Sequence, residues 1–216
     1  MIIMIIITRF TDIKKLEKAP RNLLIYGRRK TGKTFLVKSY FKGGEYFFVK
    51  RGGSIYYENR GESIDYKTFT ILLDKLFNEK KLVIIDEFHR LPLDFLDFLH
   101  VKSPLNTILV TSTLHLIKQV VGPGSPITGL FYEYKVDLID ERDILLNLAE
   151  HVRNPRKLVE YSIYLREPIL LRSFTGNNFF NLIKGFKLAV PALIGEIFTE
   201  EERSFSVKYE GIMRAI

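Results

Sequence analysis

The chain has 216 residues, of which 46% are hydrophobic and 27% are charged, and its formal net charge is +8. It contains no cysteine, which excludes disulfides and thiolate zinc sites, and its four histidines lack the close pairing of a metal-binding helix. No apolar stretch approaches the roughly 20 residues that a transmembrane helix needs, so we expect a cytoplasmic globular protein with one or two cores and no membrane segment.

Between residues 22 and 112, short β-branched apolar runs alternate with segments of helical period, the pattern of a parallel sheet with crossover helices. The pattern predicts strands at residues 22–26, 45–50, 81–86, 106–112 and 131–138, helices at 33–41, 64–79 and 93–99, and a loop at 51–63. After residue 139 only helical patterns continue, at residues 143–152, 156–165, 178–186 and 200–216. We therefore predict an α/β domain at 1–139 and a small helical domain at 140–216.

A phosphate-binding loop follows the first predicted strand. The sequence GRRKTGKT fits G-x-x-x-x-G-K-T, in which glycines let backbone N–H groups wrap phosphates at the start of a helix. Its Lys33 would reach the β- and γ-phosphates, and the Thr34 hydroxyl would ligate Mg²⁺. The residues that we expect around the nucleotide are Gly27, Arg28, Arg29, Lys30, Thr31, Gly32, Lys33, Thr34 and Phe35. The motif predicts that the chain binds Mg·ATP.

Charge is concentrated around this loop. Between Arg9 and Arg51, thirteen Lys or Arg residues stand against three acidic ones. Such a stretch is typical of a protein surface that binds nucleic acid. Several of these cations, however, already lie where a triphosphate would be held. Both interpretations stay open.

Two further polar groups follow predicted strands. Leu82–Glu87 (LVIIDE) delivers two carboxylates at a strand end, where ligands of such sheets bind. Asp86 would hold Mg²⁺ through water and Glu87 would deprotonate the attacking water, although a solvated acidic pair would look the same. Ser112, at the end of a later strand, is our candidate sensor of the γ-phosphate, against the simpler role of a turn residue.

Together these segments resemble the archaeal-type ATPase family, a branch of the STAND and AAA-like P-loop ATPases. The resemblance rests on RFTDIKKLEK, LIYGRRKTGKTFLV, VIIDEFHRL and ILVTSTLHLI. It implies that Phe10 or its neighbours lie against adenine, that Glu87 is the catalytic base and that Ser112 is the sensor. YLREP at Tyr164–Pro168 resembles a segment of the family's helical domain whose proline lies near the nucleotide.

The chain departs from this family in two respects. Relatives often show SPLYGR where this chain has SPITGL, so Leu130 replaces an arginine that could stabilise charge. Because an arginine finger is worth about 10³ to 10⁵ in rate, we expect slow intrinsic hydrolysis, with Arg142, Arg166 and Arg172 as unranked substitutes. The chain also ends at Ile216 without the usual winged helix, so the resemblance does not carry DNA binding.

Three functions fit these residues. The first is an ATPase switch in which hydrolysis through Glu87 changes the packing of the helical segment, and the second is a module that holds ATP with negligible hydrolysis and contacts a protein or DNA partner or another copy of itself. A small-molecule kinase is a third reading, against which the adjacent carboxylates argue. GTP is disfavoured because no N-K-x-D or T-K-x-D segment follows the strands. His89 either couples the site to a partner or simply packs.

Overall fold

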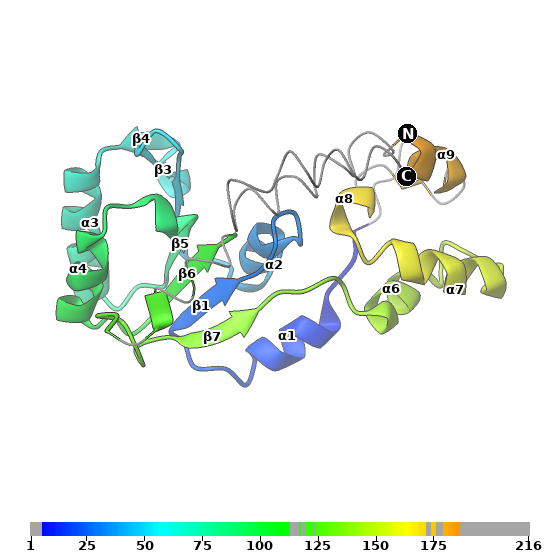
Figure 1. Ribbon diagram of the computed structural model, residues 1–216, viewed down its shortest axis with the longest axis horizontal. Coiled ribbons are helices and arrows are strands. Elements are labelled where there is room, and N and C mark those ends of the chain that lie inside the picture. The colour runs from blue at the N-terminus through cyan, green and yellow to red at the C-terminus, as the bar shows by residue number, and fades with distance from the viewer. Residues whose placement is uncertain are drawn as a thin grey trace. The chain divides into compact units, whose positions relative to one another are not determined.

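The computed structural model describes residues 6–112, 117, 120–122, 124–171, 174–175 and 179–185 (Figure 1). The chain divides into two compact units, which are described separately below. The sheet unit consists of Lys18–Gly27 and Lys33–Val136. The helical unit consists of Met1–Glu17, Arg28–Gly32 and Asp137–Ile216. The division at residues 139 and 140 that the sequence suggested stays a prediction.

A single sheet forms the centre of the sheet unit, and in the described residues it has seven strands in the order β4-β3-β2-β5-β6-β1-β7. The strands are β1 (Leu23–Tyr26), β2 (Glu45–Val49), β3 (Ile55–Tyr57), β4 (Glu62–Ile64), β5 (Val83–Asp86), β6 (Thr107–Thr111) and β7 (Tyr132–Lys135). The run β2-β5-β6-β1-β7 is parallel. The predicted α/β class with a parallel P-loop sheet is therefore confirmed.

The segment predicted as a loop at 51–63 is instead an antiparallel extension of the sheet, so that prediction was wrong. Strands β3 and β4 pair with β2 and with each other, joined by the short 3-10 helix Glu58–Arg60. The strands were missed because each has only three residues and glycines interrupt their period. Tyr57 stacks on Phe47 with ring centroids 4.5 Å apart, so this tyrosine is a packing residue.

Helices cover both faces of this sheet, with α3 (Tyr66–Asn78) and α4 (Asp94–Lys102) on one face and α2 (Lys33–Tyr40) on the other (Figure 1). The Asp65 side chain starts α3 by accepting a hydrogen bond from the backbone N–H of Thr68 at 2.8 Å. Phe69 and Leu73 then lie on the buried stripe of α3, and neither side chain is exposed. The three helices predicted within residues 33–99 are confirmed.

The helical unit contains α1 (Phe10–Leu16), α6 (Glu141–Leu148), α7 (Pro155–Tyr164), α8 (Pro168–Leu171) and α9 (Phe179–Gly185). Asp140 caps α6, and Asn154 caps α7, which has Pro155 in its first turn. Aromatic contacts between Tyr161 and Phe179, with centroids 4.4 Å apart, tie α7 to α9. Helices predicted at 143–152, 156–165 and 178–186 are confirmed, whereas the one at 200–216 lies outside the described residues. No helix of the described part is long and apolar enough to cross a membrane.

Candidate functional site

The carboxyl ends of three neighbouring parallel strands bring the candidate side chains of the sheet unit together. Strands β5, β6 and β1 are adjacent, with Asp86 opposite Val110 and Tyr26 opposite Thr111. Because parallel strands end at the same edge, the residues that follow them meet there. This edge carries Lys33 and Thr34 at the start of α2.

Lys33 is held against the backbone that precedes it. Its ammonium group donates a hydrogen bond to the carbonyl oxygen of Gly27 at 2.7 Å, and the side chain is buried. Gly27 has φ 148°, and a Cβ there would lie 2.2 Å from the carbonyl oxygen of Val136. Only glycine allows this close backbone approach.

The Asp86 carboxylate is the buried acceptor of the site. Its Oδ2 accepts hydrogen bonds from the Thr34 hydroxyl and from the Tyr46 hydroxyl, both at 2.6 Å. Burial raises the pKa of Asp86, and these two hydrogen bonds act in the opposite direction. Tyr46 was not identified from the sequence, because its proximity depends on β2 pairing with β5.

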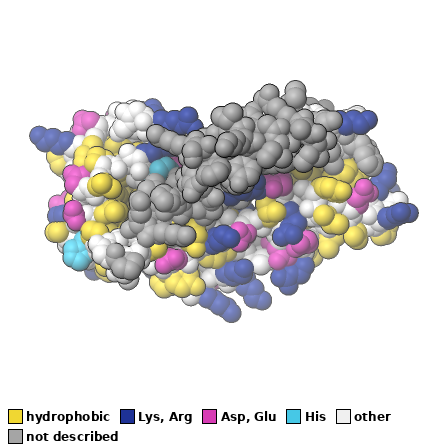
Figure 2. Space-filling view, viewed as in Figure 1, with side chains coloured by type: hydrophobic (Ala, Val, Ile, Leu, Met, Phe, Trp, Pro, Cys, Tyr) yellow, Lys and Arg dark blue, Asp and Glu magenta, His cyan; other side chains and the backbone are white. Residues whose placement is uncertain are grey.

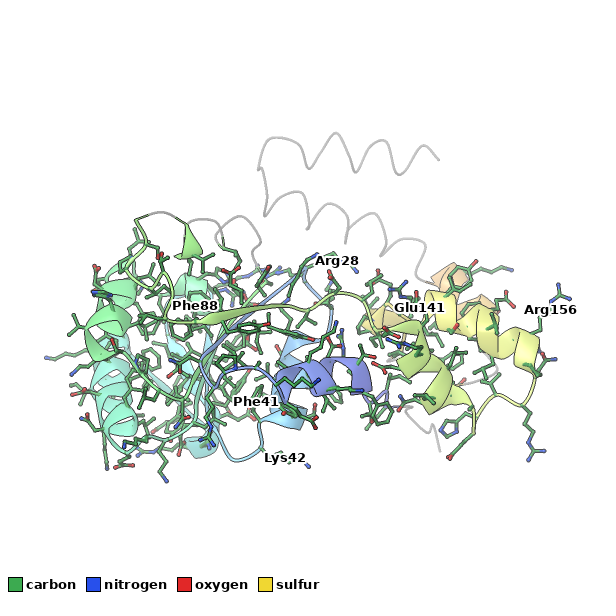
Figure 3. All side chains as sticks on the ribbon, turned by 90° about the horizontal axis from the view of Figure 1, so that it is seen from below. Arg28, Phe41, Lys42, Phe88, Glu141 and Arg156 are labelled. Carbon is green, nitrogen blue, oxygen red and sulfur yellow. The ribbon has the colours of Figure 1, made fainter. Side chains whose placement is uncertain are left out.

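Glu87 lies in a left-handed conformation, with φ 58° and ψ 37°, which is costly for a non-glycine residue and is often found at functional sites. The Ser112 hydroxyl donates to its two carboxylate oxygens at 3.1 and 3.0 Å. Oε2 is also 3.4 Å from His89 Nδ1 and 3.4 Å from Arg90 Nη2. Phe88, labelled in Figure 3, is buried in the core and anchors this turn.

His89 and Arg90 are each anchored a second time. His89 Nδ1 is 2.8 Å from the Thr111 hydroxyl, and Arg90 donates to the Val49 carbonyl oxygen at 2.8 Å. His89 therefore packs within the site, in line with the simpler of its two interpretations. Arg90 was missed, although its spacing of three residues from Glu87 in a tight turn was visible in the sequence.

In the helical unit, the middle of the phosphate loop contacts Arg9 and Pro168. Arg9, 4% exposed, donates to the Thr31 carbonyl oxygen at 2.6 Å and to Asp12 at 2.6 Å. A Cβ on Gly32, which has φ 86°, would lie 3.6 Å from Pro168 Cγ. The proline of the YLREP segment therefore lies beside Gly32, and its position near a nucleotide, which the resemblance implied, stays a prediction.

Arg28, labelled in Figure 3, pairs with an acidic residue of the same unit. Its Nη2 lies 2.6 Å from both carboxylate oxygens of Glu167. The Arg28 carbonyl oxygen also accepts the Thr31 hydroxyl at 2.9 Å. No sequence motif links Arg28 to Glu167, because the two residues are 139 positions apart.

The other predicted residues around the nucleotide differ in exposure. Arg29 is half-buried, and Lys30 is exposed with φ 63°. Phe10 on α1 and Phe35 on α2 are 48% and 51% exposed, so aromatic surface is available at both. Leu130 packs against the core of the sheet unit.

Two of the three arginines considered as substitutes pair with acidic residues of the helical unit. Arg142 pairs with Asp140 at 3.0 Å, and Arg166 pairs with Glu141 and donates to the Ile139 carbonyl oxygen at 3.0 Å. Arg172 lies outside the described residues, as does Thr113 beside Ser112.

Residues 19–124 match the family model described as an AAA domain. Over this segment the chain is similar to the AAA-type P-loop ATPases. This confirms the ATPase family that the sequence motifs suggested. No curated protein matches the chain in sequence.

Two solved structures have a fold similar to that of this chain. It is similar to a Walker-type ATPase of Pyrococcus abyssi, with 18% identity, a TM-score of 0.63, and coverage of 92% of this chain and 76% of that one. It is also similar to a STAND protein with a tetratricopeptide repeat sensor from Pyrococcus horikoshii, with 15% identity, a TM-score of 0.53, and coverage of 96% and 39%. At these identities the similarity establishes the fold.

Basic and acidic side chains both occur on the face shown in Figure 2. Lys and Arg side chains of the described residues lie among Asp and Glu side chains on that face. Nucleic-acid binding, which the basic stretch between Arg9 and Arg51 left open, stays a prediction.

Proposed function

We propose that the chain binds Mg·ATP through its P-loop and hydrolyses it as a nucleotide-dependent switch. The proposal is carried by two adjacent carboxylates at one sheet edge that have different hydrogen-bond partners. Asp86 is bonded to the Thr34 hydroxyl, and Glu87 is bonded to the Ser112 hydroxyl. One carboxylate is thus committed to the metal position and the other to the reacting water.

The donors beside the loop suit Mg²⁺. The ion prefers oxygen ligands, and Thr34 and Asp86 offer a hydroxyl and a carboxylate 2.6 Å apart. When bound, the ion would neutralise charge on the phosphates. Lys33 would supply a further positive charge to the β- and γ-phosphates.

Glu87 is the proposed general base. It would take a proton from water as the water oxygen bonds to the γ-phosphorus and the bond to the ADP oxygen breaks, leaving ADP and phosphate. Ser112 keeps both carboxylate oxygens within hydrogen-bond reach at this strand end. In this assignment Ser112 orients the base and senses the γ-phosphate.

The test is phosphate release from Mg·ATP by the wild-type chain and by Glu87→Gln, with nucleotide binding recorded for both. Glutamine keeps the size of the side chain but accepts protons poorly, so we expect release to fall by about 100-fold or more, within the 10² to 10⁴ attributed to general bases. Binding should be unchanged within about threefold.

Glu150→Gln is the matched control, because Glu150 is exposed at the end of α6 and the charge change is the same. Equal release by Glu87→Gln and wild type would remove Glu87 from the mechanism. Binding without release by either protein would favour the second candidate, a nucleotide-holding module. That candidate is supported by Leu130, which stands where relatives often have an arginine. It is also supported by Arg142 and Arg166, because these possible substitutes pair with acidic residues.

The Arg28–Glu167 pair supports a switch, because phosphate and Glu167 would compete for one guanidinium. We expect Glu167→Gln to raise ATP affinity about 3- to 10-fold, the effect of roughly 1 kcal/mol from a partly exposed ion pair. Affinity for adenosine should not change, since adenosine carries no phosphate. Titration calorimetry with both ligands measures this, and weaker ATP binding by the variant would show that Glu167 instead prepares Arg28 for phosphate.

A further inference from the structure

Tyr46 lies beside the proposed metal position, although it belongs to neither of the sequence motifs that predicted this position. In the parallel pair β2–β5, Tyr46 is opposite Ile84 and Phe48 is opposite Asp86. Tyr46 and Asp86 therefore lie on the same face of the sheet, two residue positions apart along the strands. At this diagonal separation, a side chain as long as tyrosine reaches its neighbour.

The contact between them is short and buried. The Tyr46 hydroxyl is 2.6 Å from Asp86 Oδ2, and the two residues are 5% and 1% exposed. Oδ2 is also the oxygen that accepts the Thr34 hydroxyl at 2.6 Å. Two hydroxyl protons, one from β2 and one from α2, therefore converge on one carboxylate oxygen.

The aromatic ring of Tyr46 is itself fixed. Lys38 Nζ on α2 lies 4.1 Å from the ring centroid, and Lys38 also pairs with Glu58. The ring and the hydroxyl of Tyr46 are thus both held in place.

We propose that Tyr46 is a positioning residue of the Mg²⁺ site, which fixes the rotamer of the Asp86 carboxylate and so sets the affinity of the nucleotide complex for the cation. This inference rests on the proposed Mg·ATP function. Residues that hydrogen-bond a metal ligand orient it, and their loss typically lowers metal affinity 10- to 100-fold. Without the Tyr46 hydroxyl, Asp86 keeps Thr34 as its hydroxyl partner but loses the anchor from β2.

The experiment is a Mg²⁺ titration of ATP binding with Tyr46→Phe, which removes one oxygen atom and keeps the ring. We expect the Mg²⁺ concentration for half-maximal enhancement of ATP binding to rise about 10-fold. Affinity for ATP in the presence of a chelator should stay within about twofold of wild type, because the phosphate loop is unaltered. The same titration with Mn²⁺, followed by its paramagnetic signal, gives a readout independent of hydrolysis.

Tyr57→Phe is the matched control, because it removes a tyrosine hydroxyl on the adjacent strand β3 that donates to Glu45 at 2.5 Å, away from Asp86. Its Mg²⁺ dependence should equal that of wild type. An unshifted Mg²⁺ midpoint in Tyr46→Phe would overturn the inference. It would also be overturned if ATP affinity fell as much in the presence of the chelator as in the presence of Mg²⁺, because that result would indicate a purely structural role. Failure of the wild-type chain to bind ATP at all would overturn the proposed function instead.

Discussion

Alanine in place of Lys33 is expected to lower the affinity for Mg·ATP by roughly 10- to 100-fold. Charge-assisted hydrogen bonds contribute about 1.5 to 3 kcal/mol, and each 1.4 kcal/mol is a factor of ten. The Lys33 ammonium group is buried and lies 2.7 Å from the Gly27 carbonyl oxygen, so it is already held at the mouth of the loop. Equilibrium titration with ATP and adenosine measures the effect, and only ATP should lose affinity.

Lys42→Ala serves as the control for this change. Lys42 is exposed just beyond the end of α2 and is labelled in Figure 3, so its replacement removes the same charge outside the loop. Its ATP affinity should match that of wild type. If Lys33→Ala bound ATP as wild type does, the P-loop assignment would be wrong. Lys33→Met, which keeps the apolar stem, separates loss of charge from loss of packing.

Gly27→Ala is expected to destabilise the sheet unit by about 2 to 4 kcal/mol. A strained positive φ costs a non-glycine residue about 1 to 3 kcal/mol. The added Cβ would also lie 2.2 Å from the Val136 carbonyl oxygen, and neither backbone segment can move without disturbing the pair β1–β7. Urea unfolding measures the loss as a lower midpoint.

Gly52 provides the comparison for this substitution. It lies in the turn between β2 and β3, its φ is not in the left-handed region, and a Cβ there would meet nothing within 4 Å. Gly52→Ala should therefore leave the midpoint within about 0.5 kcal/mol of wild type. Equal midpoints for both variants would contradict the close approach between Gly27 and Val136.

Local patterns in the sequence determined most of the α/β framework. Strands β1, β2, β5 and β6 were predictable because buried parallel strands are short apolar runs, and β7 was predictable because its residues alternate. The loop GRRKTGKT, the Asp86–Glu87 pair and Ser112 were identifiable because phosphate binding requires fixed residue types at fixed spacings along one segment. The structure brings Thr34 to Asp86 and Ser112 to Glu87, and their catalytic roles stay proposals.

Only the tertiary structure decided which residues support this framework. Tyr46 reaches Asp86 because β2 lies next to β5, and Arg28 meets Glu167 although 139 positions separate them. The hairpin β3–β4 likewise depends on β2 offering its free edge, since three-residue strands carry too little pattern to be recognised. The physical reason is common to all three: long-range pairing is set by the folding of each unit as a whole, whereas a motif records only the chemistry of its own segment.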